Sequence, residues 1–176
     1  YPKQPMSISQ MVINEISEKL SGSIRTDFQV LALLAFSKPA SNTSRSAPIY
    51  RVAYRPGRAT YVSVIKTDAQ TNGPNVLYWE TSVTKLLEKE TGGKYTITLS
   101  MTKCKAKSIV PLYDVSFAHD GSVLSTYVFA EVGAVPITKG AIDDDMVAVV
   151  CGSTNEAEVV RDPLMDAAGL FGEYRS

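Results

Sequence analysis

The sequence predicts a mainly β single domain spanning residues 1–176. Two architectures are open: a β-sandwich or barrel, possibly jelly-roll-like, with about three short helices, or an α+β sheet. Three observations lead to this class. Polar and apolar residues alternate over several short segments, and turn signals such as Pro56-Gly57 and Asp120-Gly121 separate those segments. The length of 176 residues, 44% hydrophobic and 20% charged, is that of one folded domain.

The first predicted element is an amphipathic helix over residues 8–20. Ser7 and Gln10 form a capping-box pair at its start, and Gly22 is a natural stop after its end. Residues 1–22 are thus predicted to be an N-terminal arm and helix. The apolar stripe of this helix must be covered by its own domain or by a neighbour, so we expect it to take part in self-association through Met11, Ile16 and Leu20.

Strands are predicted through most of the remaining chain. Residues 28–36 form an apolar run nine residues long, which is typical of a strand buried on both faces. Further strands are expected over residues 49–55, 59–66, 76–79, 94–107, 112–118, 123–132 and 146–151. Asp120-Gly121 predicts a hairpin turn between two of them.

Two short helices complete the predicted elements. Residues 82–90 have helical spacing of Val83, Leu86 and Leu87 before Gly92-Gly93. Asp162-Pro163 is an N-cap followed by a proline at the first helical position, and it opens a C-terminal segment of short helix and tail over residues 162–176.

The composition argues against several classes of protein. Cys104 and Cys151 are expected to be buried, reduced thiols rather than a disulfide, because free cysteine is commonly buried. With His119 they are too few for a closed zinc site, so we predict no metal and no cofactor. Apolar runs stop short of the roughly 18–20 residues that span a bilayer, so no integral membrane insertion is expected. The chain begins without Met, which suggests that N-terminal residues are missing.

A lysine cluster is the first candidate binding site. Lys103, Lys105 and Lys107 alternate with smaller residues, so on a strand all three project from one face. This stripe could bind a phosphate, a nucleic acid or an acidic partner surface. Alternatively, the lysines protect an edge strand from pairing with another chain.

An arginine cluster is the second candidate. Arg51, Arg55 and Arg58 are interleaved with tyrosines, and Arg51 and Arg55 share a face of a regular strand. Arginine with aromatic residues can hold phosphates and stack on bases, and both residue types are enriched at protein–protein contacts. A solvated surface is the alternative.

Charge is distributed unevenly along a chain whose formal net charge is zero. Residues 1–110 contain 15 basic and 7 acidic residues, whereas residues 111–176 contain 3 basic and 11 acidic residues. The acidic part includes Asp143, Asp144 and Asp145, which are expected in a solvated or salt-bridging loop before a strand. Complementary faces favour head-to-tail contacts between copies, so this triplet is a predicted self-association site.

One set of residues resembles an enzyme family. Tyr50-Arg51 at a strand start, Ser125-Thr126 in a later strand and Glu156-Ala157-Glu158 follow the order of the R-S-E group of the ADP-ribosyltransferases. The resemblance implies an NAD-dependent enzyme in which Arg51 and Ser125 hold NAD and Glu158 is catalytic. Tyr127 stands where that family usually has Ser or Thr.

The general style of the chain is similar to that of viral coat or matrix subunits. Short strands, Ser/Thr/Asn-rich loops and many tyrosines carry this likeness, which implies a location in the virion or the host-cell cytoplasm. We therefore expect a non-enzymatic structural protein that self-assembles into a homo-oligomer through basic and acidic faces, with a nucleic acid as a further partner of the basic stripe. The alternatives are the NAD-dependent enzyme and a monomeric module that binds an anion or a nucleic acid.

Overall fold

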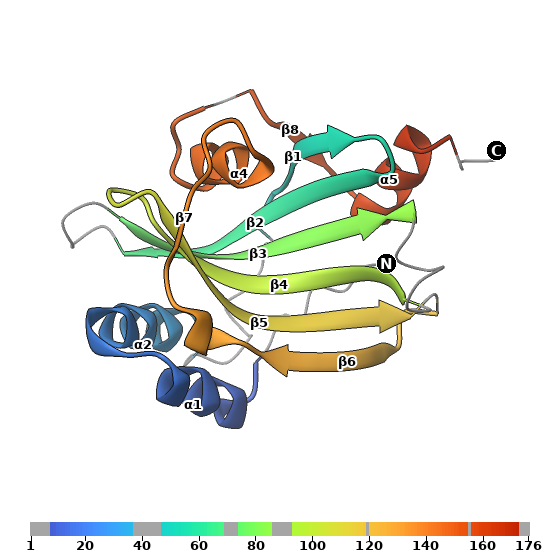
Figure 1. The fold of residues 1–176 in the computed structure, drawn as a ribbon. Helices are drawn as coiled ribbons and strands as arrows, with labels where there is room; N and C mark the ends of the chain where they lie inside the picture. Colours follow the sequence, from blue (N-terminus) through green and yellow to red (C-terminus); the bar gives the residue numbers. More distant parts are fainter. Residues whose placement is uncertain are drawn as a thin grey trace.

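The computed structural model describes residues 8–36, 47–68, 74–85, 93–118, 120–154 and 156–172. Within these residues, one sheet holds eight strands, and seven of them lie in the order β6-β5-β4-β3-β2-β1-β8 (Figure 1). The remaining strand, β7, pairs with β5, and every pairing is antiparallel. The mainly β prediction is confirmed, in the form of the α+β alternative.

The strands follow one another as neighbours through most of the sheet. Consecutive strands from β1 to β6 pair with each other, β7 pairs with β5, and β8 returns from far along the chain to pair with β1. The strands are β1 (Ile49–Arg55), β2 (Arg58–Asp68), β3 (Asn75–Thr84), β4 (Gly93–Lys103), β5 (Ser108–Ala118), β6 (Val123–Val128), β7 (Val135–Pro136) and β8 (Glu158–Val160). The predicted hairpin at Asp120-Gly121 is confirmed, since β5 and β6 pair directly.

Residues 28–36 are helical, so the predicted buried strand is wrong. They form the second half of α2 (Gly22–Phe36), which follows α1 (Gln10–Lys19). Leucine and alanine dominate the run and favour a helix, and Phe28, Leu31 and Ala32 are buried at helical spacing. The helix α1 is confirmed, but its N-cap is Ser9; the predicted cap Ser7 lies outside the described residues. Gly22, with φ of 59°, begins α2 instead of ending α1.

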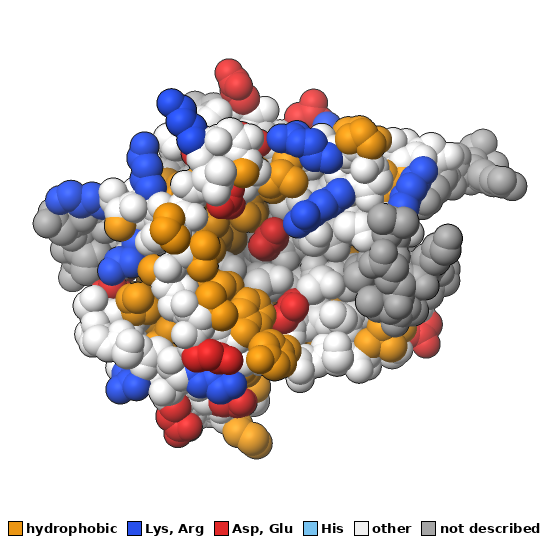
Figure 2. All heavy atoms as spheres, viewed as in Figure 1, with side chains coloured by type: hydrophobic (Ala, Val, Ile, Leu, Met, Phe, Trp, Pro, Cys, Tyr) orange, Lys and Arg blue, Asp and Glu red, His pale blue; other side chains and the backbone are white. Residues whose placement is uncertain are grey.

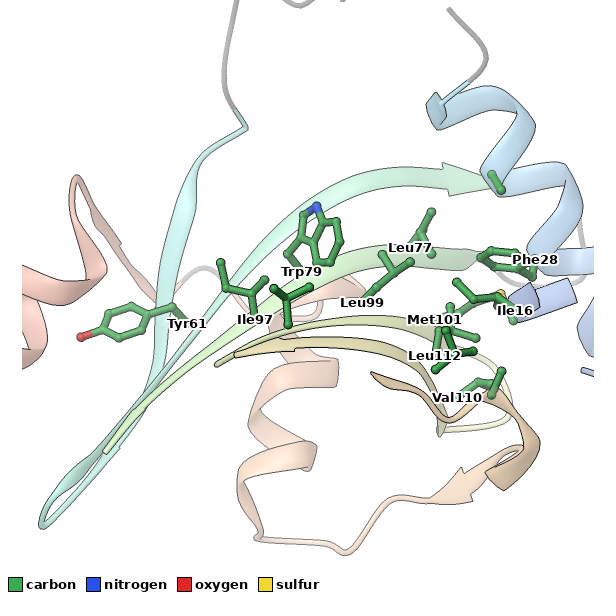
Figure 3. Close-up of a cluster of buried hydrophobic side chains, with 14 of the residues drawn as sticks. Ile16, Phe28, Tyr61, Leu77, Trp79, Ile97, Leu99, Met101, Val110 and Leu112 are labelled. Atoms are coloured by element: carbon green, nitrogen blue, oxygen red, sulfur yellow. The ribbon is translucent and has the colours of Figure 1, made fainter. Parts of the chain in front are cut away.

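The main hydrophobic core lies between one face of the sheet and the helices α1, α2 and α5 (Pro163–Leu170). Figure 3 shows Ile16 and Phe28, from the helices, beside Met101 and the strand residues next to it. The core continues along the sheet through Leu77, Trp79, Ile97, Leu99 and Leu112. The predicted start of α5 is confirmed, because the Asp162 carboxylate accepts hydrogen bonds from the first-turn amides and Pro163 follows it.

The opposite face of the sheet is partly covered by α4 (Ile142–Val150), where Met146 and Val150 pack against Val62 and Tyr78. The prediction of a strand over residues 146–151 is therefore wrong. The acidic triplet forms the first turn of α4 and not a loop as predicted, and carboxylates near a helix N-terminus are stabilised by its dipole.

The remaining differences concern the ends of elements and the cysteines. Strand β4 ends at Lys103 and a turn occupies residues 104–107, and β6 ends at Val128 before a 3₁₀ turn, η2 (Ala130–Val132). Residues 82–84 belong to β3, and residues 86–90 of the predicted short helix lie outside the described residues. The expectation of reduced thiols is wrong, because Cys104 and Cys151 form a disulfide. In the described residues, no helix is long and apolar enough to cross a membrane.

Candidate functional site

An ion-pair cluster joins the sheet to the C-terminal elements. Arg51 on β1 donates through Nη1 to Asp166 Oδ1 on α5 at 2.7 Å and through Nη2 to Glu158 Oε2 on β8 at 2.5 Å. The Tyr61 hydroxyl on β2 donates to the other oxygen of Asp166 at 2.6 Å. Charge-assisted hydrogen bonds of this kind are about twice as strong as neutral ones, so the cluster fixes α5 and β8 against the sheet.

The protonation states of this cluster follow from burial and from its acidic neighbours. Burial alone lowers the pKa of Arg51, but the hydrogen bond and charge of Asp166 and the charge of Glu158 outweigh it, and the pKa is raised. The pKa of Tyr61 is also raised, first by burial and then by its hydrogen bond to Asp166. Arg51 therefore stays charged and Tyr61 stays a neutral donor at ordinary pH.

A cavity of about 470 Å³ opens beside this cluster, between α4, β1 and β8. Four charged residues are among those that line it: Asp145, Glu156, Glu158 and Arg51. Its apolar lining comes from Val52, Ala148, Val149 and Ala157. We call this feature the acidic cavity. A second cavity of about 710 Å³ begins on the other side of Glu158 and is lined by β8 and α5 residues that include Asp162 and Asp166.

Arg51 and Arg55 point to opposite faces of the sheet, so the predicted shared face is wrong. A β-bulge between Arg51 and Ala53 adds one residue and reverses the alternation. Arg51 pairs in register with Tyr61, on the face of the main core, whereas Arg55 pairs with Arg58 and lies 3.9 Å from Asp145 of α4. Two of the three arginines of the predicted binding cluster, Arg51 and Arg55, thus have carboxylates of the same chain as neighbours.

The three lysines of the predicted stripe are divided between a strand and a turn, so a single face of a strand is wrong for them. Lys103 ends β4 and contacts Asp27 of α2 at 3.3 Å. Lys105 and Lys107 are exposed in the turn that follows, with Lys107 in the left-handed region at φ of 51°. Since β4 lies between β3 and β5, the alternative role as edge-strand lysines is also wrong.

Two further exposed lysines belong to the same end of the sheet. Lys66 is on β2 and pairs in register with Leu77, which pairs in turn with Met101 near the end of β4. Lys139 lies two residues after Ile137, and the Ile137 amide donates to the Lys107 carbonyl at 3.3 Å. We call Lys66, Lys105, Lys107 and Lys139 the basic end. In Figure 2, several Lys and Arg side chains lie along the left side of the molecule.

The predicted self-association residues have different environments. Ile16 and Leu20 are buried in the main core, so the domain itself covers the stripe of α1, whereas Met11 on the same helix is 78% exposed. Asp143 and Asp144 accept hydrogen bonds from the loop amides of Thr138 and Gly140. The remaining member of the triplet, Asp145, lines the acidic cavity.

The residues that resemble the R-S-E group are only partly brought together. Arg51 and Glu158 are in contact, but Ser125 is on β6, at the opposite edge of the sheet. Five strand spacings separate β6 from β1, which is roughly 24 Å. Arg51 and Glu158 bind each other, and Ser125 stays remote from both.

A polar patch on the α4 side of the sheet was not predicted from the sequence. Glu80, Thr98, Asp114 and Tyr127 lie in one register row across β3 to β6. Burial raises the pKa of Glu80, the charges of Asp114 and Asp143 add to this effect, and Arg58 opposes it. Burial also raises the pKa of Asp114, against the hydrogen bonds from Thr98 and from a backbone amide. The Ser and Thr residues at alternate positions of β4 were the available signal, because they mark one face of that strand as polar.

Among the described residues, no group of three or more His, Cys, Asp and Glu side chains is placed to hold a metal ion. His119 lies outside the described residues. Comparisons with protein-family models, with curated proteins and with solved structures find no match.

Proposed function

We propose that this chain is a non-enzymatic structural subunit that associates with copies of itself. The observation that carries the proposal is the outer face of α2. Residues 30–36 of this helix are all apolar, and a helix segment of that kind is normally covered on all sides. Yet Val30 is 42% exposed and Leu34 is 52% exposed. We call Val30 and Leu34 the helical apolar face.

A second copy is the occupant that the rest of the molecule favours. The formal charge is zero although basic and acidic residues are concentrated in different parts of the chain, so copies attract where unlike parts meet and carry no net repulsion. A two-fold contact that packs the α2 helices of two copies against each other would cover the helical apolar face on both sides at once. Viral coat and matrix subunits are one class of protein that would use such contacts.

Sedimentation velocity at tens of micromolar tests this proposal. At high salt, which screens charged contacts, we expect the parent chain to sediment above the monomer mass and the variant Val30→Glu/Leu34→Glu to shift towards the monomer. The matched control is Thr26→Glu/Gln29→Glu, which adds the same charge at exposed polar positions of the same helix and should associate like the parent. A parent chain that remains a monomer at every salt concentration would overturn the proposal.

A monomeric anion-binding module is the second candidate, and the basic end favours it. Lys105 and Lys107 are exposed in the turn, whereas Lys103 is held by Asp27. In this case Lys105→Ser/Lys107→Ser would abolish binding to a short DNA duplex, while the chain would sediment as a monomer with or without the substitutions. The NAD-dependent alternative would require Ser125 to approach Arg51 and Glu158 across the sheet.

A further inference from the structure

We propose that the basic end of one copy, led by Lys105 and Lys107, docks into the acidic cavity of the next copy. This inference rests on the proposed self-association and names a second contact for it, separate from the helical apolar face. The contact is heterologous, since a basic surface on one copy meets an acidic surface on another.

The turn that carries Lys105 and Lys107 is fixed from several sides. The disulfide to Cys151 ties its first residue to the end of α4, and the Cys104 amide donates to the Pro74 carbonyl at 3.1 Å. At its other end the Lys107 carbonyl accepts the Ile137 amide. The backbone therefore presents both lysines without having to be ordered on binding, which lowers the entropic cost of a contact.

The acidic cavity matches a lysine side chain in charge and in chemistry. Asp145, Glu156 and Glu158 are exposed, and Arg51 is already bound by Glu158 and Asp166, so carboxylate oxygens remain to accept from an ammonium group. A lysine stem can pack on the apolar lining from α4 and β1 while its head reaches the carboxylates. A volume of about 470 Å³ is within the usual range of roughly 300–1,000 Å³ for ligand pockets.

The two surfaces occupy different parts of one copy. In Figure 1 the turn between β4 and β5 is at the left end of the sheet, whereas β1 and β8 form the upper edge beyond α4. A contact between unlike surfaces leaves one free basic end and one free acidic cavity on every pair. It therefore extends into a ring or a filament instead of stopping at a dimer.

Charge exchange tests the contact directly. Lys105→Glu/Lys107→Glu reverses the basic end, and Asp145→Lys/Glu156→Lys reverses the cavity without touching the Arg51 ion pairs to Glu158 and Asp166. Each variant alone should associate at least tenfold more weakly than the parent at low salt. An equimolar mixture of the two should recover association, because each unlike pair restores one original contact. Thermal unfolding of both variants confirms that they are folded before they are compared.

A carbodiimide cross-link locates the contact. In a mixture of ¹⁴N- and ¹⁵N-labelled parent chain, mass spectrometry should find mixed-label peptides that join Lys105 or Lys107 to Asp145, Glu156 or Glu158. The contact is overturned if the parent chain associates, the charge variants associate with an affinity within twofold of the parent, and no such peptides are found. That result leaves the proposed function standing. A monomeric parent overturns the proposed function itself.

Discussion

Asp166 shows how much of the C-terminal structure depends on one carboxylate. Each of its oxygens accepts a short hydrogen bond, one from Arg51 and one from Tyr61. Asp166→Ala would leave the half-buried guanidinium with Glu158 alone and the Tyr61 hydroxyl without its acceptor. Because an unsatisfied buried polar group costs about 1–3 kcal/mol, we expect a loss of that size in the free energy of unfolding, measured with urea at pH 7.

The control for this prediction is Tyr61→Phe. It removes one hydrogen bond and keeps the ring in the core, so it should cost only about 1 kcal/mol. If Asp166→Ala costs no more than Tyr61→Phe, the Arg51 ion pair does not stabilise the fold.

Glu80 contributes to the pH dependence of the free energy of unfolding, and the sign of this contribution is opposite to that of a salt-bridged carboxylate. Its pKa in the folded chain is raised above the ordinary value of 4.5, chiefly by burial, so the folded state holds the proton more tightly than the unfolded state. The associated stability is complete below about pH 4.5 and is lost as the pH rises through the raised pKa. Glu80→Gln should therefore raise the free energy of unfolding at pH 7, by about 1.4 kcal/mol for each pKa unit removed, and should flatten its dependence above pH 4.5.

Urea unfolding of both proteins from pH 4 to pH 8 measures this difference. The two curves should converge at the acid end of that range. A Glu80→Gln variant that is less stable than the parent at pH 7 would mean that the charged form is favoured, with Arg58 outweighing burial.

At the scale of elements, the disulfide links the turn after β4 to the end of α4. Cys104 and Cys151 are separated by 47 residues, and closing a loop of that length in the unfolded chain is worth about 4 kcal/mol in the loop-entropy description. Reduction, or Cys104→Ser/Cys151→Ser, should lower the free energy of unfolding by up to that amount. Denaturant unfolding with and without reductant measures the loss. An unchanged denaturant midpoint would contradict a stabilising effect of the disulfide.

The sheet was predictable from the sequence because its signals are local. The β-type segment at residues 49–55 before Pro56-Gly57, the Asp120-Gly121 turn and the Asp162-Pro163 cap each require only a few neighbouring residues, and each is confirmed. The apolar runs at residues 28–36 and 146–151 were misassigned, because a buried strand and a buried helix look alike at that length. Leucine and alanine in the first run, and the aspartates before the second, were the signals that favour a helix.

The candidate site was less predictable because it depends on register and on distant pairing. A single bulge in β1 separates Arg51 from Arg55, and no local pattern announces that extra residue. The acidic cavity exists only because β8 returns to pair with β1. Pairing over more than a hundred residues is set by tertiary packing, so the sequence could identify the charged residues but not their neighbours.

The edges of the sheet also bear on how copies could meet. β6 is an edge strand with exposed Leu124 and Tyr127, but Lys19 from α1 donates to its last carbonyl at 3.0 Å. A bulge interrupts its pairing near Leu124, and the other edge, β8, has only three residues. Lysines, bulges and short edges are the usual means of preventing strand pairing between chains. Association through side-chain surfaces therefore fits this fold better than continuation of the sheet.

At the scale of the whole molecule, the two proposed contacts differ in symmetry and should be separable. The helical apolar face pairs with itself and closes at two copies, whereas the basic end and the acidic cavity form an open series. Blocking the charged contact with Lys105→Glu/Lys107→Glu should leave dimers, and blocking the apolar contact with Val30→Glu/Leu34→Glu should leave rings or filaments that dissolve at high salt. Combining the four substitutions should leave monomers.

Mass photometry at low and high salt distinguishes these states in one series. Because salt screens exposed charges over about 10 Å at 0.1 M and over less at higher concentrations, only the charged contact should weaken steeply with added salt. If Val30→Glu/Leu34→Glu leaves dimers, or if Lys105→Glu/Lys107→Glu leaves large assemblies, the symmetries of the two contacts are exchanged: the charged contact closes at two copies and the apolar contact forms the open series. A species that both pairs of substitutions abolish separately would show one composite interface, in which the helical apolar face and the charged surfaces act together.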